Sequence, residues 1–360
     1  MPRSIIVGSG SQIPPNLVTN AMLARIMDTS DRWIRERTGV ETRYFVDSGT
    51  SSTDLGVAAA ARALDAAGVE PREIDIVVFA TMTPDYYMPG CGGLLQARLG
   101  LRTVPCFDIR QQCSGFLYGL QLADAQIRAG FARTVLLVGA EVHSGFLPWR
   151  AASWARLFSS AWEEEGAQVP MPSEEWDANT RTRHLSVLFG DAAAAVVVQA
   201  YEGADRGVID SLLGADGSAA DKLFVPGVGS RRRPYVDVGQ LERLEHMPVM
   251  DGQQVFRMAT TRMAEVARAV LERNGATSGD VRVVLMHQAN KRINEFVQRM
   301  LQLSDEQVVH NIHKYANTTS ATIPLLWDEC VRTGRIQPGD LVLLVGFGAG
   351  MTWGATLLRA

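Results

Sequence analysis

The pentapeptide VLLVG occurs twice in this chain, at Val135–Gly139 and again at Val342–Gly346. The second copy follows the first by 207 residues (346 − 139). Two further pairs of segments keep this spacing: IDIVVFA from Ile74 with VRVVLMH from Val281, and ALDAAG ending at Gly68 with VLERNG ending at Gly275. Apolar strands resemble one another by chance, but three matches in one register indicate an internal duplication.

Each half of the duplication is predicted to run helix, strand, strand, helix, strand. Its apolar strands suit a sheet that is covered on both faces. Two such sheets, with helices between and outside them, give a layered α/β architecture. We therefore expect two pseudo-symmetric halves in an α-β-α-β-α arrangement. The first half is residues 1–200 with an insertion at about 144–180, and the second is residues 201–360. The insertion holds four of the seven tryptophans and the acidic run Glu163–Glu165, and we expect it to cap or enlarge a cleft.

The composition is that of an ordinary globular protein, with 46% hydrophobic and 21% charged residues. A net charge of −4 leaves no electrostatic footprint for nucleic acid. The four cysteines form no C-x-x-C pair, and no apolar run reaches the length of a membrane span. We also expect no signal peptide, because the opening residues MPRSIIVGSGSQ show no apolar h-region. We expect a cytoplasmic protein with free thiols and neither a metal site nor a permanently bound cofactor.

Cys113 lies in the stretch DIRQQCSGFLYGL, between a predicted strand and a predicted helix. The positive N-terminus of a helix favours a thiolate, so we expect a lowered pKa and a nucleophile. In the second half, KYANTTSATIPL occupies a similar junction. The repeat spacing carries Cys113 to position 320, and a short insertion would then match Cys113 with Asn317. Since His287 ends the strand VVLM, pseudo-twofold symmetry brings Cys113, His287 and Asn317 towards one cleft.

Cysteine, histidine and asparagine support two kinds of chemistry. In a papain-type hydrolase, the histidine deprotonates the thiol and the asparagine orients the histidine. In an acyl-transferring enzyme, Cys113 takes an acyl group from a thioester. Neutral His287 and the Asn317 amide then donate hydrogen bonds to the enolate that forms when a malonyl thioester loses carbon dioxide. Two donors contributed by the other half favour the second scheme, although Asn317 could instead simply cap the following helix.

Several motifs together resemble those of the β-ketoacyl-ACP synthase III family in the thiolase superfamily. They are CSGFLYGL, MHQANKRI, KYANTTSATIPL, GFGAGMTWGATLLR, DRWIRERTGVETRYF and MDGQQVFRMA. The resemblance runs from the first strand to the last residue, apart from residues 144–180. It implies a thiolase-like fold, a homodimer and ping-pong catalysis. An acyl-CoA would load the enzyme, and a malonyl thioester carried by acyl carrier protein (ACP) or CoA would then condense with the bound acyl group.

The resemblance also assigns roles residue by residue. Cys113 matches the nucleophile, and His287 and Asn317 match the decarboxylation pair. The remaining matches are backbone N–H groups of Cys113 and Ala349 for the oxyanion hole, Trp33 and Arg37 for the adenine end of CoA, and Asn290 and Arg292 for the pantetheine arm and the ACP-facing entrance.

Met88 departs from the family pattern. The family often has an aromatic residue here that reaches into the partner subunit's acyl tunnel. A flexible methionine blocks a tunnel less firmly, so we expect medium-length or bulkier acyl groups to be accepted. Two alternatives stay open: a non-decarboxylative acyltransferase or acyl–acyl condensing enzyme of specialised metabolism, and, with less support, a thioester hydrolase.

Overall fold

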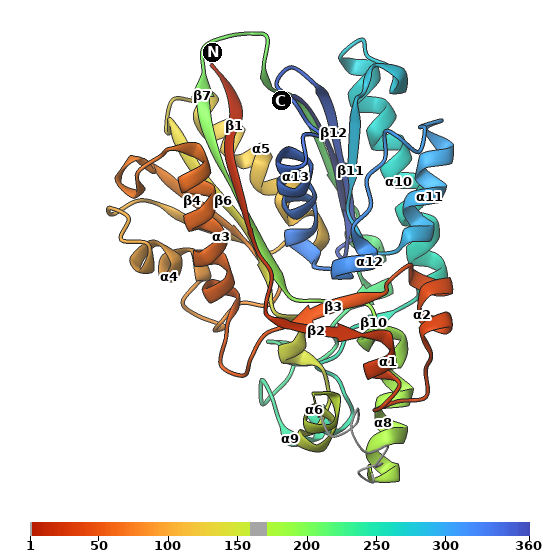
Figure 1. Cartoon of the computed structure of the whole chain (residues 1–360). Coiled ribbons are helices and arrows are strands. Elements are labelled where there is room, and N and C mark those ends of the chain that lie inside the picture. The colour runs from red at the N-terminus through yellow and green to blue at the C-terminus, as the bar shows by residue number, and fades with distance from the viewer. Residues whose placement is uncertain (1, 159–170) are drawn as a thin grey trace.

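The structure is a computed structural model that describes residues 2–158 and 171–360, and its strands form two main sheets (Figure 1). The first sheet has the order β1 (Arg3–Gln12), β7 (Ala192–Tyr201), β6 (Thr134–Glu141), β4 (Ile76–Ala80) and β5 (Cys106–Ile109). The second has the order β11 (Val283–Met286), β12 (Leu341–Gly348), β13 (Thr352–Arg359) and β8 (Gly207–Ala215). Two small sheets pair β2 (Asn16–Thr19) with β3 (Thr42–Phe45), and β9 (Leu223–Phe224) with β10 (Val249–Met250).

The two main sheets repeat one pattern of pairing. β6 pairs parallel with β4 and antiparallel with β7, and β12 likewise pairs parallel with β11 and antiparallel with β13. β12 begins and ends 207 residues after β6 (341 − 134 and 348 − 141). The predicted pair of pseudo-symmetric halves is therefore confirmed, whereas the boundary at residue 200 stays a prediction.

Helices cover both faces of both sheets, which gives the expected five layers (Figure 1). α5 (Gly115–Arg128) and α13 (Thr322–Arg332) lie between the sheets. The outer layers are α3 (Ser52–Ala67) and α4 (Cys91–Arg98) on the first sheet, and α10 (Gly252–Arg273) and α11 (Lys291–Met300) on the second. The other α-helices of the described residues are α1 (Asn20–Leu23), α2 (Asp31–Thr38), α6 (Ala151–Leu157), α8 (Ser173–Ser186), α9 (Val238–Glu242) and α12 (Ile312–Tyr315).

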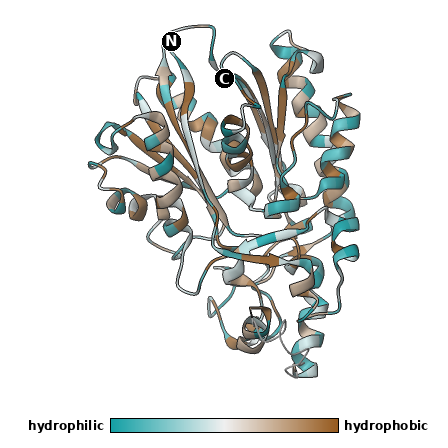
Figure 2. Cartoon of the chain, viewed as in Figure 1, coloured by the Kyte–Doolittle hydropathy of each residue, from teal (hydrophilic) through white to brown (hydrophobic). Residues whose placement is uncertain are grey.

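The central helices are apolar on every side that meets a sheet, and this is why they lie in the middle layer. One core cluster joins Phe116, Leu117 and Leu120 of α5 to Ile323 and Leu326 of α13 and to strands of both sheets. In Figure 2 the strands are largely hydrophobic, whereas α11 carries much hydrophilic surface towards solvent. The starts of α5 and α13 are thus held inside the molecule, where the two halves meet.

The segment from 144 onward joins a small lobe at one end of the molecule. Trp149 and Leu157 pack there with Phe45 and with the apolar residues of β2, α1 and α2. Asn179 of α8 reaches the same lobe and donates to Ile26 O (3.0 Å). The expected insertion is therefore partly helical, while Trp162 and the acidic run Glu163–Glu165 lie outside the described residues.

The two junctions before the central helices correspond without any insertion. A short 3-10 turn precedes each helix, η2 (Gln112–Ser114) before α5 and η6 (Thr319–Ala321) before α13. The turns begin 207 residues apart (319 − 112), and their first residues share a positive φ, 45° and 48°. The match of Cys113 with Asn317 was wrong: the counterpart of Cys113 is Ser320, and Asn317 precedes the turn.

Candidate active site

Cys113 is held at the meeting point of η2, α5 and the end of β12. A Cβ added to Gly348 would lie 3.0 Å from Cys113 N and 3.1 Å from Cys113 Cβ. Such distances are tighter than nearly all contacts of a Cβ atom, so the absence of a side chain at Gly348 lets β12 approach Cys113 closely. Ala349 directly follows this glycine, just beyond the end of β12, where the chain passes beside the Cys113 backbone.

The pKa of the Cys113 thiol is raised to about 12, mainly by burial and secondly by the negative charge of Glu141. Its own N–H group and the Thr319 hydroxyl act in the opposite direction but do not outweigh these effects. The expected lowering of this pKa by the helix N-terminus was therefore wrong. At neutral pH the resting residue is a thiol, because desolvation and the negative charge of Glu141 both disfavour the thiolate.

His287 follows β11 and is buried. Its Nδ1 lies 3.0 Å from Thr322 Oγ1, which also reaches the carbonyl oxygen of Thr319 at 2.6 Å. The Thr322 hydroxyl donates its one proton to Thr319 O, so Nδ1–H is the donor to Thr322 in this arrangement. When the hydroxyl proton turns to Nδ1 instead, the hydrogen of the imidazole sits on Nε2. His287 Nε2 is buried and has no hydrogen-bond partner in the described part of the chain. Burial, and then the neighbouring His143, lowers the pKa of His287 to about 3, so the ring is neutral.

Asn317 is fixed by hydrogen bonds on both its backbone and its side chain. Its N–H donates to Leu188 O (2.9 Å), and its Oδ1 accepts from Thr319 N (2.9 Å). The side-chain oxygen therefore caps the turn, as the simpler interpretation predicted. Because that oxygen is occupied, the amide NH₂ group is the free end of the side chain, and within residues 2–158 and 171–360 it has no recorded acceptor.

A second histidine, His143, lies beside the same turn and was not predicted. Its Nε2 is 2.7 Å from Thr319 Oγ1, and its Nδ1 is 2.9 Å from Gly190 O. Its ring stacks on Phe189, with the ring centroids 4.7 Å apart. Burial lowers the pKa of His143 to about 4, so it too is neutral. No motif surrounds His143 in the sequence, and only the folded chain brings it to Thr319.

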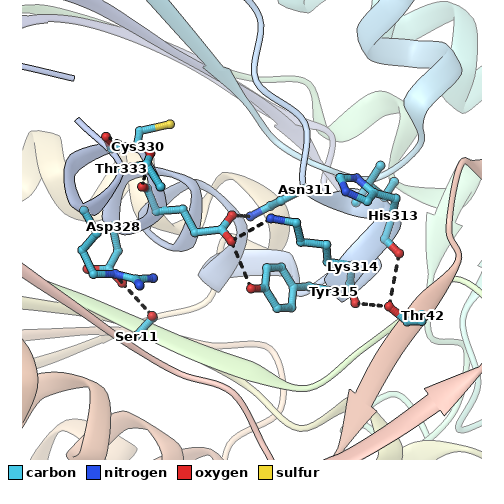
Figure 3. Close-up of polar contacts among 12 residues, drawn as sticks. Ser11, Thr42, Asn311, His313, Lys314, Tyr315, Asp328, Cys330 and Thr333 are labelled. Atoms are coloured by element: carbon cyan, nitrogen blue, oxygen red, sulfur yellow. Dashed lines mark hydrogen bonds and ion pairs between the residues drawn. The ribbon is translucent and has the colours of Figure 1, made fainter. Parts of the chain in front are cut away.

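Polar contacts along α12 and α13 hold the backbone that leads to Asn317. Glu329 accepts from Asn311 Nδ2 (2.8 Å), Lys314 Nζ (3.3 Å) and Tyr315 Oη (3.0 Å), as Figure 3 shows. The preceding residue, Asp328, accepts from Ser11 Oγ (2.6 Å) of β1. These bonds anchor the approach to Asn317 on both α13 and the first sheet.

The residues expected to bind CoA and ACP lie together at one surface. Arg37 stacks on the ring of Trp33 at 4.5 Å from the centroid, and Arg183 of α8 lies at 4.9 Å from the same ring. Asn290 donates to Arg37 O (2.9 Å) and accepts from Arg292 N (2.9 Å), so it caps α11 and ties it to α2. Arg37 and Arg292 are exposed. Arg183 was not predicted, since its place on the ring follows only from the fold of α8.

Met88 lies at the tip of the loop after β4. It is 76% exposed, and the neighbouring Tyr86 and Tyr87 are exposed too. A cavity of about 910 Å³ opens at the base of this loop, lined by Met82, Thr83, Val142 and Phe146 among others. Within the single chain the Met88 side chain is therefore not part of the core.

The described residues contain neither a candidate metal site nor a membrane-spanning helix. No group of three or more His, Cys, Asp or Glu side chains there could hold a metal ion. No helix in the same part of the chain is both long enough and apolar enough to cross a membrane.

Two family models match the chain. One, 3-oxoacyl-[acyl-carrier-protein (ACP)] synthase III, matches residues 107–161 and 173–217. The other, the C-terminal part of the same kind of enzyme, matches residues 271–360. The first match includes Cys113, and the second includes both His287 and Asn317.

Relatives are similar over the whole length. A β-ketoacyl-[acyl-carrier-protein] synthase III of Rhizorhabdus wittichii is 40% identical over 359 residues and covers 100% of both chains. The crystal structure of 3-oxoacyl-[acyl-carrier-protein] synthase III from Aquifex aeolicus VF5 is 34% identical, with a TM-score of 0.82, over 99% of this chain and 100% of that one. The priming β-ketosynthase of the R1128 polyketide pathway is 30% identical, with a TM-score of 0.81, over 99% and 96%.

Proposed function

Because this chain belongs to the 3-oxoacyl-[acyl-carrier-protein] synthase III family, we propose that Cys113, His287 and Asn317 carry out its condensation. The chain is an acyltransferase. It is primed by acyl-CoA and makes a β-ketoacyl-ACP by decarboxylative condensation with malonyl-ACP. The observation that supports our assignment is a pair of unused groups, His287 Nε2 and the Asn317 amide, within one buried cluster.

In the loading step, Cys113 Sγ attacks the thioester carbonyl of acyl-CoA. The bond between that carbonyl and the CoA sulfur breaks, and the thiol proton leaves with CoA as its free thiol. We assign the oxyanion of this step to the N–H groups of Cys113 and Ala349. The close passage of Gly348 beside Cys113 N supports this assignment, since Ala349 is the next residue.

In the second step, the malonyl group loses carbon dioxide, and the electron pair of the broken bond forms an enolate. His287 Nε2–H and the Asn317 amide donate to the enolate oxygen once the Thr322 hydroxyl proton has turned from Thr319 O to His287 Nδ1. The enolate carbon then attacks the acyl-Cys113 carbonyl, and the sulfur leaves and takes up a proton. A neutral histidine is needed for this role, and the low pKa of His287 supplies one.

At the surface, Trp33 and Arg37 are assigned to the adenine end of CoA, and Asn290 and Arg292 to the path of the pantetheine arm and of ACP. The stacking of Arg37 on Trp33 and the exposure of Arg292 support these roles. CoA thioesters serve here as substrates, not as permanent cofactors. The exposed apolar tip at Met88 supports a homodimer in which this loop reaches the partner's acyl tunnel. A cytoplasmic location stays a prediction.

Mass spectrometry of the intact protein tests the assignment of the nucleophile. Acyl-CoA should add one acyl mass to the peptide with QQCSGF, and Cys113→Ala should abolish it. Cys106→Ala is the control, because Cys106 is also a half-buried free thiol. Acylation of Cys113→Ala at the wild-type level would refute the role.

The assignment of His287 and Asn317 is tested by separating the two steps. Replacing either by Ala should slow malonyl decarboxylation about 10²–10³-fold while acyl loading falls far less. An equal loss in both steps would instead favour the hydrolase-like scheme, with His287 as the base for Cys113.

A further inference from the structure

Glu141 is a fully buried carboxylate at the end of β6. One oxygen, Oε1, accepts from Ser320 Oγ at 2.7 Å and from Ser320 N at 3.4 Å. The other, Oε2, accepts from Thr83 Oγ1 at 2.7 Å, from Thr83 N at 3.1 Å and from Met82 N at 3.1 Å. A single side chain thus joins the turn η6 of the second half to the loop that follows β4 of the first.

The internal duplication gives Glu141 an equivalent position in the second half. The counterpart of Glu141 in the second half is Gly348 (348 − 141 = 207), and the counterpart of Cys113 is Ser320. The fold therefore builds two equivalent junctions. At one, Gly348 faces Cys113 and leaves space around the nucleophile. At the other, the Glu141 side chain occupies the corresponding space and accepts a hydrogen bond from Ser320.

Glu141 also acts on the catalytic thiol through its charge. Its carboxylate raises the pKa of Cys113, second only to burial. The other described side chains bonded to Glu141 are Thr81, Thr83 and Ser320, which do not titrate. Burial in turn raises the pKa of Glu141 to about 7, so this carboxylate titrates near neutral pH.

We propose that Glu141 is a positioning residue of the active site with two effects. Through Ser320 it holds the turn η6, and with it Asn317 and Thr319, in the place where they serve the reaction. Bonded to Ser320, next to Thr319, its negative charge adds to the effect of burial in disfavouring the Cys113 thiolate. The first effect rests on the function proposed above, whereas the second concerns the thiol alone.

Alkylation of Cys113 by iodoacetamide tests the charge effect without any substrate. In Glu141→Gln the negative charge is gone, so the pKa of Cys113 should fall and its alkylation at pH 7.5 should become faster. Each unit by which the Cys113 pKa falls gives about ten times more thiolate. A thiolate of lower pKa is also a weaker nucleophile, so the alkylation rate should rise by only about three-fold. The matched control is Asp191→Asn, because Asp191 is another buried carboxylate with a raised pKa, bonded to Ser144 and Val46. Unchanged alkylation in Glu141→Gln, or an equal gain in Asp191→Asn, would overturn the charge effect.

Ser320→Ala separates the positioning effect from the charge effect. It removes the hydroxyl bond to Glu141 and leaves the carboxylate in place. Malonyl decarboxylation should fall about ten-fold, and iodoacetamide alkylation should not accelerate. Full decarboxylation activity in Ser320→Ala, while His287→Ala and Asn317→Ala are impaired, would refute the positioning effect and leave the proposed function standing.

Discussion

At the scale of single residues, Thr319 connects the members of the proposed catalytic cluster. Its N–H holds Asn317, its carbonyl accepts from the threonine that contacts His287, and its hydroxyl bonds to His143 and to the Cys113 sulfur. It does so with a φ of 48°, a conformation that is costly for a β-branched residue. Strain of this kind persists only where the surroundings enforce it, and here they include His143, Asn317 and Thr322, which all bond to Thr319.

Removal of the Thr319 hydroxyl should therefore cost both stability and loading. Thr319→Val leaves the buried Nε2 of His143 without a partner, which costs about 1–3 kcal/mol in the free energy of unfolding. It also removes a bond that lowers the pKa of Cys113, so acyl loading should slow several-fold. Urea unfolding and mass spectrometry of loading measure the two effects. Thr319→Ser keeps the hydroxyl and should resemble wild type, and a Ser variant as impaired as Val would contradict the explanation.

At the scale of elements, the active site depends on how closely the end of β12 approaches the turn η2. Gly348→Ala should push Cys113 out of position, because its new Cβ would meet backbone atoms. We expect acyl loading to fall at least ten-fold with the fold retained, as checked by mass spectrometry and circular dichroism. Gly346→Ala is the control on the same strand, since its Cβ would meet the flexible Leu117 Cδ1 at 3.1 Å. Equal losses in both variants would argue against this account.

The order of elements was predictable from the sequence because the duplication preserved spacing. The two copies of VLLVG are the centres of β6 and β12, and the 207-residue offset extends to the turns before α5 and α13. The alignment of Cys113 with Asn317 failed because it followed residue type, whereas the backbone follows the offset. His143 was missed for a different reason: its partners are 47 and 176 residues away, and no local pattern records such contacts.

The pKa of the Cys113 thiol also could not be predicted from the local sequence. A helix start favours a thiolate, and the sequence revealed the helix start. Burial and the charge of Glu141 act in the opposite direction, and both arise from the packing of two halves around Cys113. Local sequence therefore predicted one contribution to the pKa but could not reveal the two larger ones.

At the scale of the whole molecule, four fully or nearly fully buried ionisable groups lie on the strands and turns around the interface between the halves. Burial raises the pKa of Glu141 to about 7 and that of Asp191 to about 6. It lowers the pKa of His143 to about 4 and that of His287 to about 3. Their effects on stability have opposite signs. Between about pH 4.5 and 6 the unfolded chain holds extra protons on two histidines, and the folded chain holds extra protons on two carboxyls.

The contributions of these four groups to the pH dependence of stability should therefore largely cancel in the wild type. Glu141→Gln removes a group that binds its proton more tightly when folded. Relative to wild type, its free energy of unfolding should thus fall by about 1.4 kcal/mol for each pH unit of acidification from 6.5 to 5. His143→Phe removes a group that binds its proton more tightly when unfolded, so its slope should differ by the same amount in the opposite direction. Urea unfolding at several pH values measures both slopes, and the comparison of slopes is unaffected by any constant loss of stability. Parallel slopes of the free energy of unfolding against pH in wild type and both variants would contradict this prediction. They would show that these groups titrate alike in the folded and unfolded chain, although burial at the interface between the halves should separate the two.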